Sequence, residues 1–508
     1  MKRFFCITLI AIMLLSTLVA CNKGNEGNIN DSGTSDSSDV SDSGTETKSA
    51  VDNTGLEKRT YDGAEYLIVC TEGMSDWDPY PLNVTAAGAT GGNKIDAAGY
   101  KRNVIFAKDF NVKLKFDARK VHHNSNASEN SLLAELRAST LAGAEEFDLV
   151  FAGAQTAGTL ALEKYWFDLK TSEYIKPDAY YYESQVNDQL LVDGHQYFAS
   201  GFYSTQNTAA IDVTYANMTA IQKNDPTMTK EKLYELVLNH EWTLDKLLTI
   251  GASYATPDSN TAIPANVSIS SFDSTNRYAL VLSKSYCQNM YYDLGGDVIV
   301  YNDDTYEYDV VVDNGPNTNL LTYLQDTITN NTSVLLAPNN SHIAAYKVEA
   351  APFMVVTYIN MERLSEVTYE WTMLPAPLRN VGDEYRSYSD SWNLNFSGIP
   401  VANEDVDMAT YLYEMFMAYS YDYVYPAYYE QSFGTAYQPD AQSCKVFDIV
   451  AKSRVVCPAN VYGWFGDKTI NHLISDSSNS VGSTVSTMKD SVRQNMQHAI
   501  DEFNNIAG

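Results

Sequence analysis

Residues 131–152, which read SLLAELRASTLAGAEEFDLVFA, decide the class of fold. The first half of this stretch carries leucines at near-helical spacing, Leu132, Leu133, Leu136 and Leu141. The second half, residues 147–152, is a short and mainly apolar run, which predicts a buried strand. A helix that leads directly into a buried strand is part of a βαβ unit, so the sequence points to an α/β protein.

The residues before this stretch repeat the alternation of strand and helix. Residues 66–70 are a continuous apolar run and predict a buried strand, and residues 95–109 follow with a helical pattern. Residues 112–116 alternate strictly between apolar and basic side chains, which predicts a half-buried strand. Strands that alternate with helices at this interval predict βαβ units and an α/β fold.

A second region begins with an extended segment at residues 209–215. A helix is predicted at 231–239, and Thr243 is the expected N-cap of the next one, in which Asp245 complements the helix dipole. Two later helices are predicted from apolar stripes at helical spacing. Their residues are Met408, Tyr411, Leu412, Met415 and Tyr419, and Val485, Met488, Val492, Met496 and Phe503.

The N-terminus has the pattern of an exported lipoprotein. Lys2 and Arg3 precede a short apolar run at residues 4–15, and the sequence Leu-Val-Ala-Cys ends at Cys21. The run is too short to span a bilayer, so residues 1–20 are interpreted as a signal peptide. The pattern resembles bacterial lipoproteins, in which the cysteine at the cut carries the lipid. Residues 21–55 then hold the lipidated Cys21 and a polar segment that predicts a disordered tether.

Charge and cysteine content exclude some functions and leave others open. With 64 acidic and 34 basic residues the formal net charge is −30, which excludes nucleic acid as a partner through repulsion. The cysteines that remain after the signal peptide and the lipidation site form no C-x-x-C pair. A disulfide between Cys444 and Cys457 stays open, because the sequence does not show whether their Cα atoms approach within bonding range.

Short motifs along the rest of the chain resemble one protein family. They are AGYKRN at 98–103, DFNV at 109–112, LRASTLAG at 136–143, EFDLV at 146–150, EWTLDK at 241–246, MLPAP at 373–377, GIP at 398–400 and YPAYY at 425–429. Together they resemble the sugar-type (family 1) extracellular solute-binding proteins of bacterial ABC importers, in particular their large Gram-positive lipoprotein members. The chain departs from the family pattern at Asn217-Met218 and at Glu349-Ala350, so the resemblance does not identify the ligand.

The resemblance implies a two-lobed type II periplasmic-binding-protein fold with the ligand between the lobes. It also implies that the chain crosses between lobes near residues 206–212, 388–395 and 435–441. The first lobe would comprise 56–207 and 391–437, and the second 208–390 and 438–508. The lobes of such a protein close around the ligand by hinge motion, and the loaded form docks on the membrane subunits of the importer.

Two tryptophans with acidic neighbours are the first candidates for ligand contacts. A sugar site needs an aromatic ring for the apolar face of the sugar and carboxylates or amides for its hydroxyls. Trp77 and Asp78 follow the predicted strand at 66–70, where α/β sheets bind ligands, although Trp77 could equally cover the sheet edge. Trp392 follows Asp390 in a predicted crossing segment.

Three further residues are weaker candidates for ligand contacts. Gln155 comes just after the predicted strand that ends near Gly153. Tyr203 and Asn207 lie at the first predicted crossing. Amides and tyrosines in such loops are usually just solvated, so each of these residues alone is a weaker signal than either tryptophan.

No signature of a cofactor, a metal or an enzyme was identified. Residues 88–94 (GATGGNK) lack the spacing and the Ser/Thr of a phosphate-binding loop. The adjacent His122 and His123 have no nearby third ligand for zinc, and the acidic segment at 303–309 lacks the glycine and closing glutamate of an EF-hand. No cofactor and no metal are therefore predicted. Carboxylate pairs for glycoside hydrolysis depend on separation in space, which a sequence does not show.

The leading hypothesis is a non-enzymatic binding protein for a mono- or oligosaccharide. Its partners would be the solute, the membrane subunits of an ABC importer and, through the lipid on Cys21, the extracellular face of the cell membrane. A monomer is expected. Two alternatives stay open at this stage. One is a surface lipoprotein enzyme that acts on glycans, and the other is the same fold with a peptide, a polyamine or another small solute as ligand.

Overall fold

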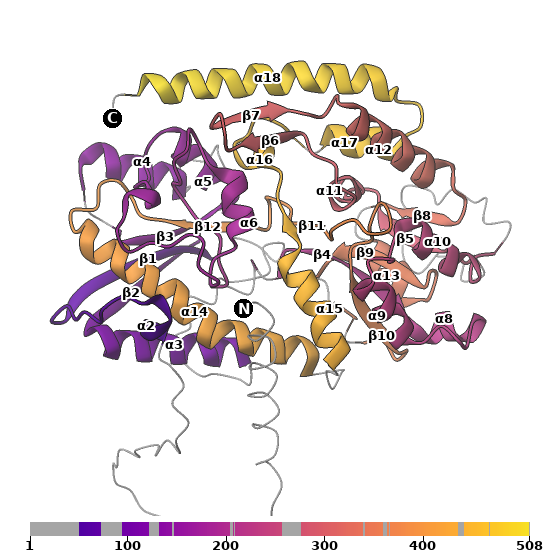
Figure 1. Ribbon diagram of the computed structural model, residues 1–508, viewed down its shortest axis with the longest axis horizontal. Helices are drawn as coiled ribbons and strands as arrows, with labels where there is room; N and C mark the ends of the chain where they lie inside the picture. Colours follow the sequence, from indigo (N-terminus) through magenta and orange to yellow (C-terminus); the bar gives the residue numbers. More distant parts are fainter. Residues whose placement is uncertain are drawn as a thin grey trace, which may run out of the picture. The chain divides into compact units, whose positions relative to one another are not determined.

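The computed structural model (Figure 1) contains two main β-sheets, two small sheets and the helices around them. It describes residues 50–72, 94–120, 132–144, 147–203, 207, 209–256, 276–338, 341–358, 363–364, 366–434, 441–466 and 468–506. The predicted signal peptide and the lipidation site at Cys21 lie outside the described residues.

The first sheet has the strand order β12-β3-β1-β2. Its strands are β1 (Ala64–Glu72), β2 (Val112–Lys120), β3 (Leu149–Gly153) and β12 (Asn395–Gly398). β1 pairs in parallel with β2 and β3, and β12 is antiparallel to β3. Helix α3 (Lys94–Phe110) connects β1 to β2, and helix α4 (Leu132–Ala142) precedes β3, as expected for βαβ units.

β3 shows why an apolar run forms this strand. All five of its residues are buried. Leu149 and Phe151 belong to one hydrophobic core cluster, whereas Val150 and Ala152 belong to another. Successive side chains of a strand point to opposite faces, so a strand that is covered on both faces needs apolar residues at every position. The predicted buried strand at 147–152 is confirmed, with bounds shifted by one or two residues.

The second sheet has the strand order β10-β4-β9-β5-β8. Its strands are β4 (Asp212–Asn217), β5 (Leu280–Ser283), β8 (Val334–Ala337), β9 (Phe353–Thr357) and β10 (Trp371–Pro375). β5 pairs in parallel with β8 and β9, whereas β4 is antiparallel to β9 and to β10. In both sheets, three parallel strands are thus bordered by an antiparallel strand from a predicted crossing region. The predicted α/β fold class is confirmed, with two main sheets, and the exact division of the chain into lobes stays a prediction.

Helices cover both sheets. α14 (Val406–Gly434) runs beside α3 and the short α2 (Ala50–Thr54) on the first sheet (Figure 1). The other helices and helical turns are α5 (Ala154–Leu162), η2 (Leu169–Thr171), α6 (Ser184–Asn187), η3 (Asp188–Leu190), α8 (Met218–Asn224), α9 (Lys230–Leu238), α10 (Leu244–Ala252), α11 (Asn289–Asp293), α12 (Gly315–Gln325), η5 (Asp326–Asn330), α13 (Ser341–Lys347), α15 (Ala441–Lys452), α16 (Pro458–Val461), α17 (Lys468–Ser475) and α18 (Val481–Asn505). The small sheets pair β6 (Ile299–Asn302) with β7 (Glu307–Val310), and β11 (Ser387–Tyr388) with β13 (Arg454–Val455).

Capping residues fix the ends of several helices. The predicted N-cap is confirmed, because the Thr243 side chain accepts a hydrogen bond from the backbone N–H of Lys246 at the start of α10. Asn217, at one of the departures from the family pattern, caps α8 through the backbone N–H of Ala220. At the other departure, Glu349 has a φ of 58°, a conformation that usually belongs to glycine.

The predicted tether is wrong at its C-terminal end. Residues 50–54 form helix α2, in which Ala50, Val51 and Thr54 are buried. This helix packs against α14 in the core of the first sheet, so two apolar side chains were enough to order a segment of otherwise polar composition. Within the part of the chain that is described, no helix combines the length and the hydropathy needed to cross a membrane.

Candidate functional site

The carboxyl edge of each main sheet adjoins a predicted crossing segment. In the first sheet, β3 ends at Gly153 opposite Asn395, where β12 begins. In the second sheet, β9 ends at Thr357 opposite Asp212, where β4 begins. Ligands of α/β proteins bind at the carboxyl ends of parallel strands. The residues that join these two edges are therefore the candidate site. They form two groups, a hydrogen-bond network around Arg454 and a pair of buried aspartates, Asp212 and Asp293.

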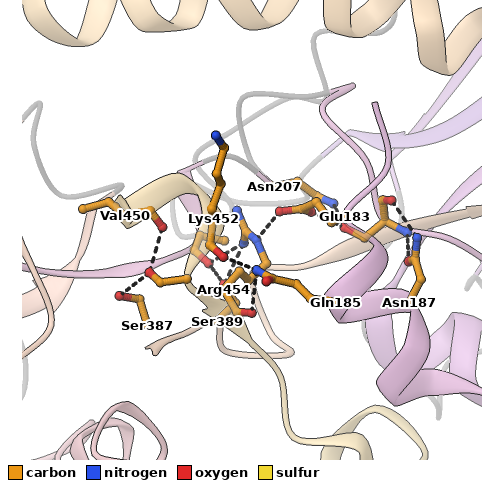
Figure 2. Close-up of polar contacts among 12 residues, drawn as sticks. Glu183, Gln185, Asn187, Asn207, Ser387, Ser389, Val450, Lys452 and Arg454 are labelled. Carbon is orange, nitrogen blue, oxygen red and sulfur yellow. Dashed lines mark hydrogen bonds and ion pairs between the residues drawn. The ribbon is translucent and has the colours of Figure 1, made fainter. Parts of the chain in front are cut away.

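A buried ion pair holds three chain segments together (Figure 2). The Arg454 guanidinium donates from Nε to Oε1 of Glu183 at 2.7 Å, and the two side chains are only 2% and 4% exposed. Arg454 also donates to the carbonyl of Ala210 at 2.9 Å and to Oγ of Ser389 at 2.6 Å. Burial of two charges is costly unless they are paired and their other polar atoms are satisfied, and these bonds supply that compensation.

The network continues from Glu183 into the first crossing (Figure 2). Ser200 donates its hydroxyl to Glu183 Oε2 at 2.5 Å, and its backbone N–H donates to Oδ1 of Asn187 at 2.7 Å. The side-chain amide of Gln185, in α6, donates to the carbonyl of Lys452. β11 and β13 pair next to these bonds, with the N–H of Ser389 donating to the carbonyl of Val455 at 2.9 Å. We call this set of hydrogen-bonded residues the crossing network.

Tyr203 and Asn207, both predicted ligand contacts, lie inside this network instead. The Tyr203 hydroxyl donates to the carbonyl of Asn395 at 2.6 Å. The Asn207 amide donates to the same carbonyl at 2.6 Å and accepts from the N–H of Asn395 at 3.0 Å. Both side chains are buried and fix the start of β12, and their contact with a ligand stays a prediction.

Two aspartates form a buried acid pair at the carboxyl edge of the second sheet. Asp212 accepts a hydrogen bond from the Thr357 hydroxyl at 3.0 Å, and Asp293 accepts one from the N–H of Tyr388 at 2.7 Å. Burial raises the pKa of both carboxyls, and the charge of Asp212 raises the pKa of Asp293 further. The side chain of Asn289, one helical turn before Asp293 in α11, hydrogen-bonds to Asp212.

Asp390 and Trp392, also predicted ligand contacts, lie beside the acid pair. Asp390 is half-buried and accepts from the backbone N–H of Trp392 at 2.9 Å. The charge of Asp390 helps to raise the pKa of the buried Asp212 and that of Tyr286, whose side chain is exposed. The structure therefore brings two of the predicted contacts together with two acids that the sequence did not single out.

The remaining predicted contacts are not assembled with these residues. Gln155 lies in the first turn of α5, directly after the carboxyl end of β3, and is half-buried. Its position at the edge of the first sheet is as predicted, and its contact with a ligand stays a prediction. Trp77 and Asp78 lie outside the described residues.

Four aromatic rings form a platform at the start of the first crossing, which the sequence analysis missed. Tyr421 and Tyr425 of α14 stack with centroids 5.1 Å apart and planes 18° apart. Phe202 lies 4.6 Å from the Tyr425 ring, and Tyr180 lies 4.8 Å from Tyr421. The i, i+4 spacing of the two α14 tyrosines was the available signal. We call these four residues the aromatic platform.

The platform adjoins the crossing network. The charges of Glu183 and Arg454 both act on the Tyr425 hydroxyl, whose pKa is raised mainly by burial. Tyr180 is exposed, and the other three rings are half-buried. Half-buried rings next to carboxylates match what a sugar requires, because the ring can cover the apolar face of the sugar while polar groups bind its hydroxyls. Among the described residues, no group of His, Cys, Asp and Glu side chains could hold a metal ion.

Comparison with known proteins gives little direct information. No family model matches the chain, and no curated protein does either. Among solved structures, the chain is similar to the ABC substrate-binding protein Lmo0181 from Listeria monocytogenes in complex with cycloalternan. The TM-score is 0.48 at 13% sequence identity, over 86% of this chain and 100% of the other. At these values the likeness identifies neither a family nor a ligand for this chain.

Loss of the buried ion pair should destabilise the protein strongly. We expect Arg454→Met to lower the free energy of unfolding by about 3–5 kcal/mol, because it leaves the Glu183 carboxylate buried without its partner. Urea denaturation followed by circular dichroism measures this. Lys489→Met is the matched control, since it breaks the more exposed ion pair with Asp313 and should cost no more than about 1 kcal/mol. Equal losses in both variants would contradict the structural role of Arg454.

The acid pair should make the protein less stable as the pH rises. Because the folded pKa of Asp212 is raised, its contribution to stability is present below about pH 4 and is lost as the pH rises through the folded value. We expect Asp212→Asn to flatten this decline. The free energy of unfolding of the variant, relative to that of the parent protein, should be about 1–3 kcal/mol higher at pH 8 than at pH 4.

Urea denaturation across this pH range tests the prediction. Asp313→Asn is the control of opposite sign, because a hydrogen bond from Lys489 lowers the pKa of Asp313. Its carboxylate contributes stability above about pH 4, so this variant should lose stability at pH 8. An Asp212→Asn profile that runs parallel to that of the parent protein would show that Asp212 ionises normally in the folded state.

Proposed function

We propose that the chain is the solute-binding subunit of an ABC importer and that it captures a carbohydrate. The observation that carries this proposal is the aromatic platform next to the crossing network. Its half-buried rings offer apolar faces, and Glu183, Asp422 and Asp448 place carboxylate charge near the ring hydroxyls. The resemblance of the spaced sequence motifs to sugar-type solute-binding proteins supports the same function.

The fold suits capture and release of a solute. Each main sheet ends its parallel strands near a crossing segment, and the segment at 388–390 contacts both Arg454 of the crossing network and Asp293 of the acid pair. A solute held between the two carboxyl edges would therefore contact both halves of the fold. Rotation about the crossing segments would close the site, and no bond of the solute needs to change during this process.

Binding of a sugar should depend on the platform and on Trp392. We expect a thermal-shift screen with residues 48–508, which form one compact unit, to give a higher melting temperature with one class of sugar, because a ligand that binds only the folded state stabilises it. Tyr425→Ala and Trp392→Ala should each weaken that sugar about tenfold or more, which corresponds to the loss of about one aromatic contact. Isothermal titration calorimetry measures the affinities.

The control for this experiment is Tyr306→Ala, which removes an exposed tyrosine between β6 and β7 that belongs to neither the aromatic platform nor the acid pair, and it should leave the affinity unchanged. Unfolding curves of all variants establish that they are folded. Absence of any shift with mono- and oligosaccharides would contradict the proposed ligand. Turnover of a sugar that is lost on replacement of one carboxylate would replace the binding function with that of a glycan-acting enzyme.

We also propose that Cys21 carries a lipid that anchors the protein to the extracellular face of the cell membrane. The proposal rests on the sequence pattern at residues 1–21, and a diacylated cysteine with a further acyl chain meets the two-chain requirement for stable anchoring. Cys21→Ser should move the protein from the membrane fraction to the medium. Cys70→Ser is the control and should stay in the membrane fraction. A Cys21→Ser protein that stays there as well would contradict the anchor.

A further inference from the structure

We propose that the captured solute carries a protonated amine, which binds between the carboxylates of Asp212 and Asp293 and the amide oxygen of Asn289. The inference rests on the proposed function, since it names the chemical class of the solute that this binding protein takes. Two sources share this chemistry, an amino sugar and a free polyamine, and the experiment below separates them.

The first observation is that two buried acceptor atoms lack donors. Neither Oδ2 of Asp293 nor Oδ1 of Asn289 has a hydrogen-bond partner, although the two residues are only 2% and 5% exposed. Buried acceptors are nearly always satisfied, because an unmade hydrogen bond costs about 1–3 kcal/mol. The two unsatisfied acceptors lie one helical turn apart, which suits a group with several donors. An ammonium group has three N–H donors and no acceptor.

The second observation is the position of these atoms. Asn289 and Asp293 are four residues apart in α11, so they lie on the same face of the helix. The hydrogen bond between the side chains of Asn289 and Asp212 shows that this face is turned toward the start of β4. Asp212 pairs with Thr357 at the end of β9, which is the edge of an α/β sheet where ligands bind.

The balance of charge favours a cation over a neutral hydroxyl. Three carboxyls interact here, since the charge of Asp390 acts on Asp212 and that of Asp212 acts on Asp293. The cation that faces Asp293 is Arg386, whose guanidinium forms an ion pair with Asp297 at 2.6 Å. A hydroxyl would leave both acids with the raised pKa that burial and their mutual charge impose, whereas an ammonium donates hydrogen bonds and also stabilises the ionised carboxylates.

Exposed aromatic side chains lie near Asp390, whose charge acts on the acid pair. Asp390 is half-buried, and both Tyr286 and Trp392 are 46% exposed. The charge of Asp390 acts on both Tyr286 and the buried Asp212, so the exposed ring and the acid pair share one carboxylate as a neighbour. Tyrosine and tryptophan rings attract cations through their π faces, which suits the approach of an amine.

Binding of an amine should release a proton. The raised pKa of both acids favours a protonated pair in the free protein, and an ammonium group beside the pair favours its ionised form. The charged groups that face the pair are Asp390 and Arg386, and both are present before and after binding. The number of protons released can be measured from the dependence of the binding enthalpy on the ionisation enthalpy of the buffer.

Calorimetry with matched ligands tests the inference on residues 48–508. Glucosamine oligomers are compared with glucose oligomers of the same length and linkage, which differ only by a hydroxyl in place of the amine, and spermidine forms a separate arm. We expect the amino sugar to bind about tenfold or more tighter than its neutral partner, with release of a proton. Asp293→Asn should abolish both the preference and the proton release, and Asp313→Asn should preserve both.

The outcomes separate this inference from the proposed function. Equal binding of the amino and neutral sugars would overturn the amine site and leave the carbohydrate function intact. Binding of spermidine alone, lost in Asp293→Asn, would support the amine site and overturn the carbohydrate as ligand. Binding of none of the three would overturn both. Asp293→Asn keeps the shape of the side chain and removes a buried charge, so it should fold, and its unfolding curve checks this.

Discussion

The ion pair between Arg454 and Glu183 is the interaction on which the rest of the candidate site depends. It joins a loop of the first sheet region to the strand β13, and through Ser389 and Ala210 it also fixes two other crossing segments. Such a pair contributes little net stability over an apolar substitute, but it specifies one arrangement, because each donor has a defined acceptor. The charges of this ion pair act on Tyr425 of the aromatic platform, and Asp293 of the acid pair holds Tyr388, the residue before Ser389.

The C-terminal segment adds a second link between the two halves of the fold. Helix α18 contacts α5, which follows the first sheet, and also α12 and β7 of the second region (Figure 1). Phe503 of α18 packs on Tyr197 and beneath the Lys164 ammonium. One continuous cluster of buried apolar residues also contains side chains of both sheets. If the proposed closing motion keeps these contacts, rotation about the crossing segments is small and side chains slide at the C-terminal helices.

Local patterns predicted most of the first sheet, and contacts between distant segments explain the rest. β1, β2 and β3 follow from apolar runs and alternation, and α3 follows from a helical pattern. Each of these elements has its buried residues in a regular pattern within its own sequence. The aromatic platform joins rings from residues 180, 202 and 421–425, which no local pattern connects. Tyr203 and Asn207 lie near the predicted first crossing, but the direction of their side chains is set by Asn395, which is distant in sequence.

The acid pair shows how one side chain can serve both the fold and the ligand. Oδ1 of Asp293 accepts the N–H of Tyr388 and so holds the second crossing segment, whereas Oδ2 has no partner. If stability alone determined this position, an asparagine or an apolar residue would remove the buried charge at lower cost. An amine on Oδ2 would change the charge of the same carboxylate that holds Tyr388, next to Ser389 of the crossing network. Binding would therefore act directly on the segment about which the two halves are proposed to rotate, because Asp293 contacts that segment itself.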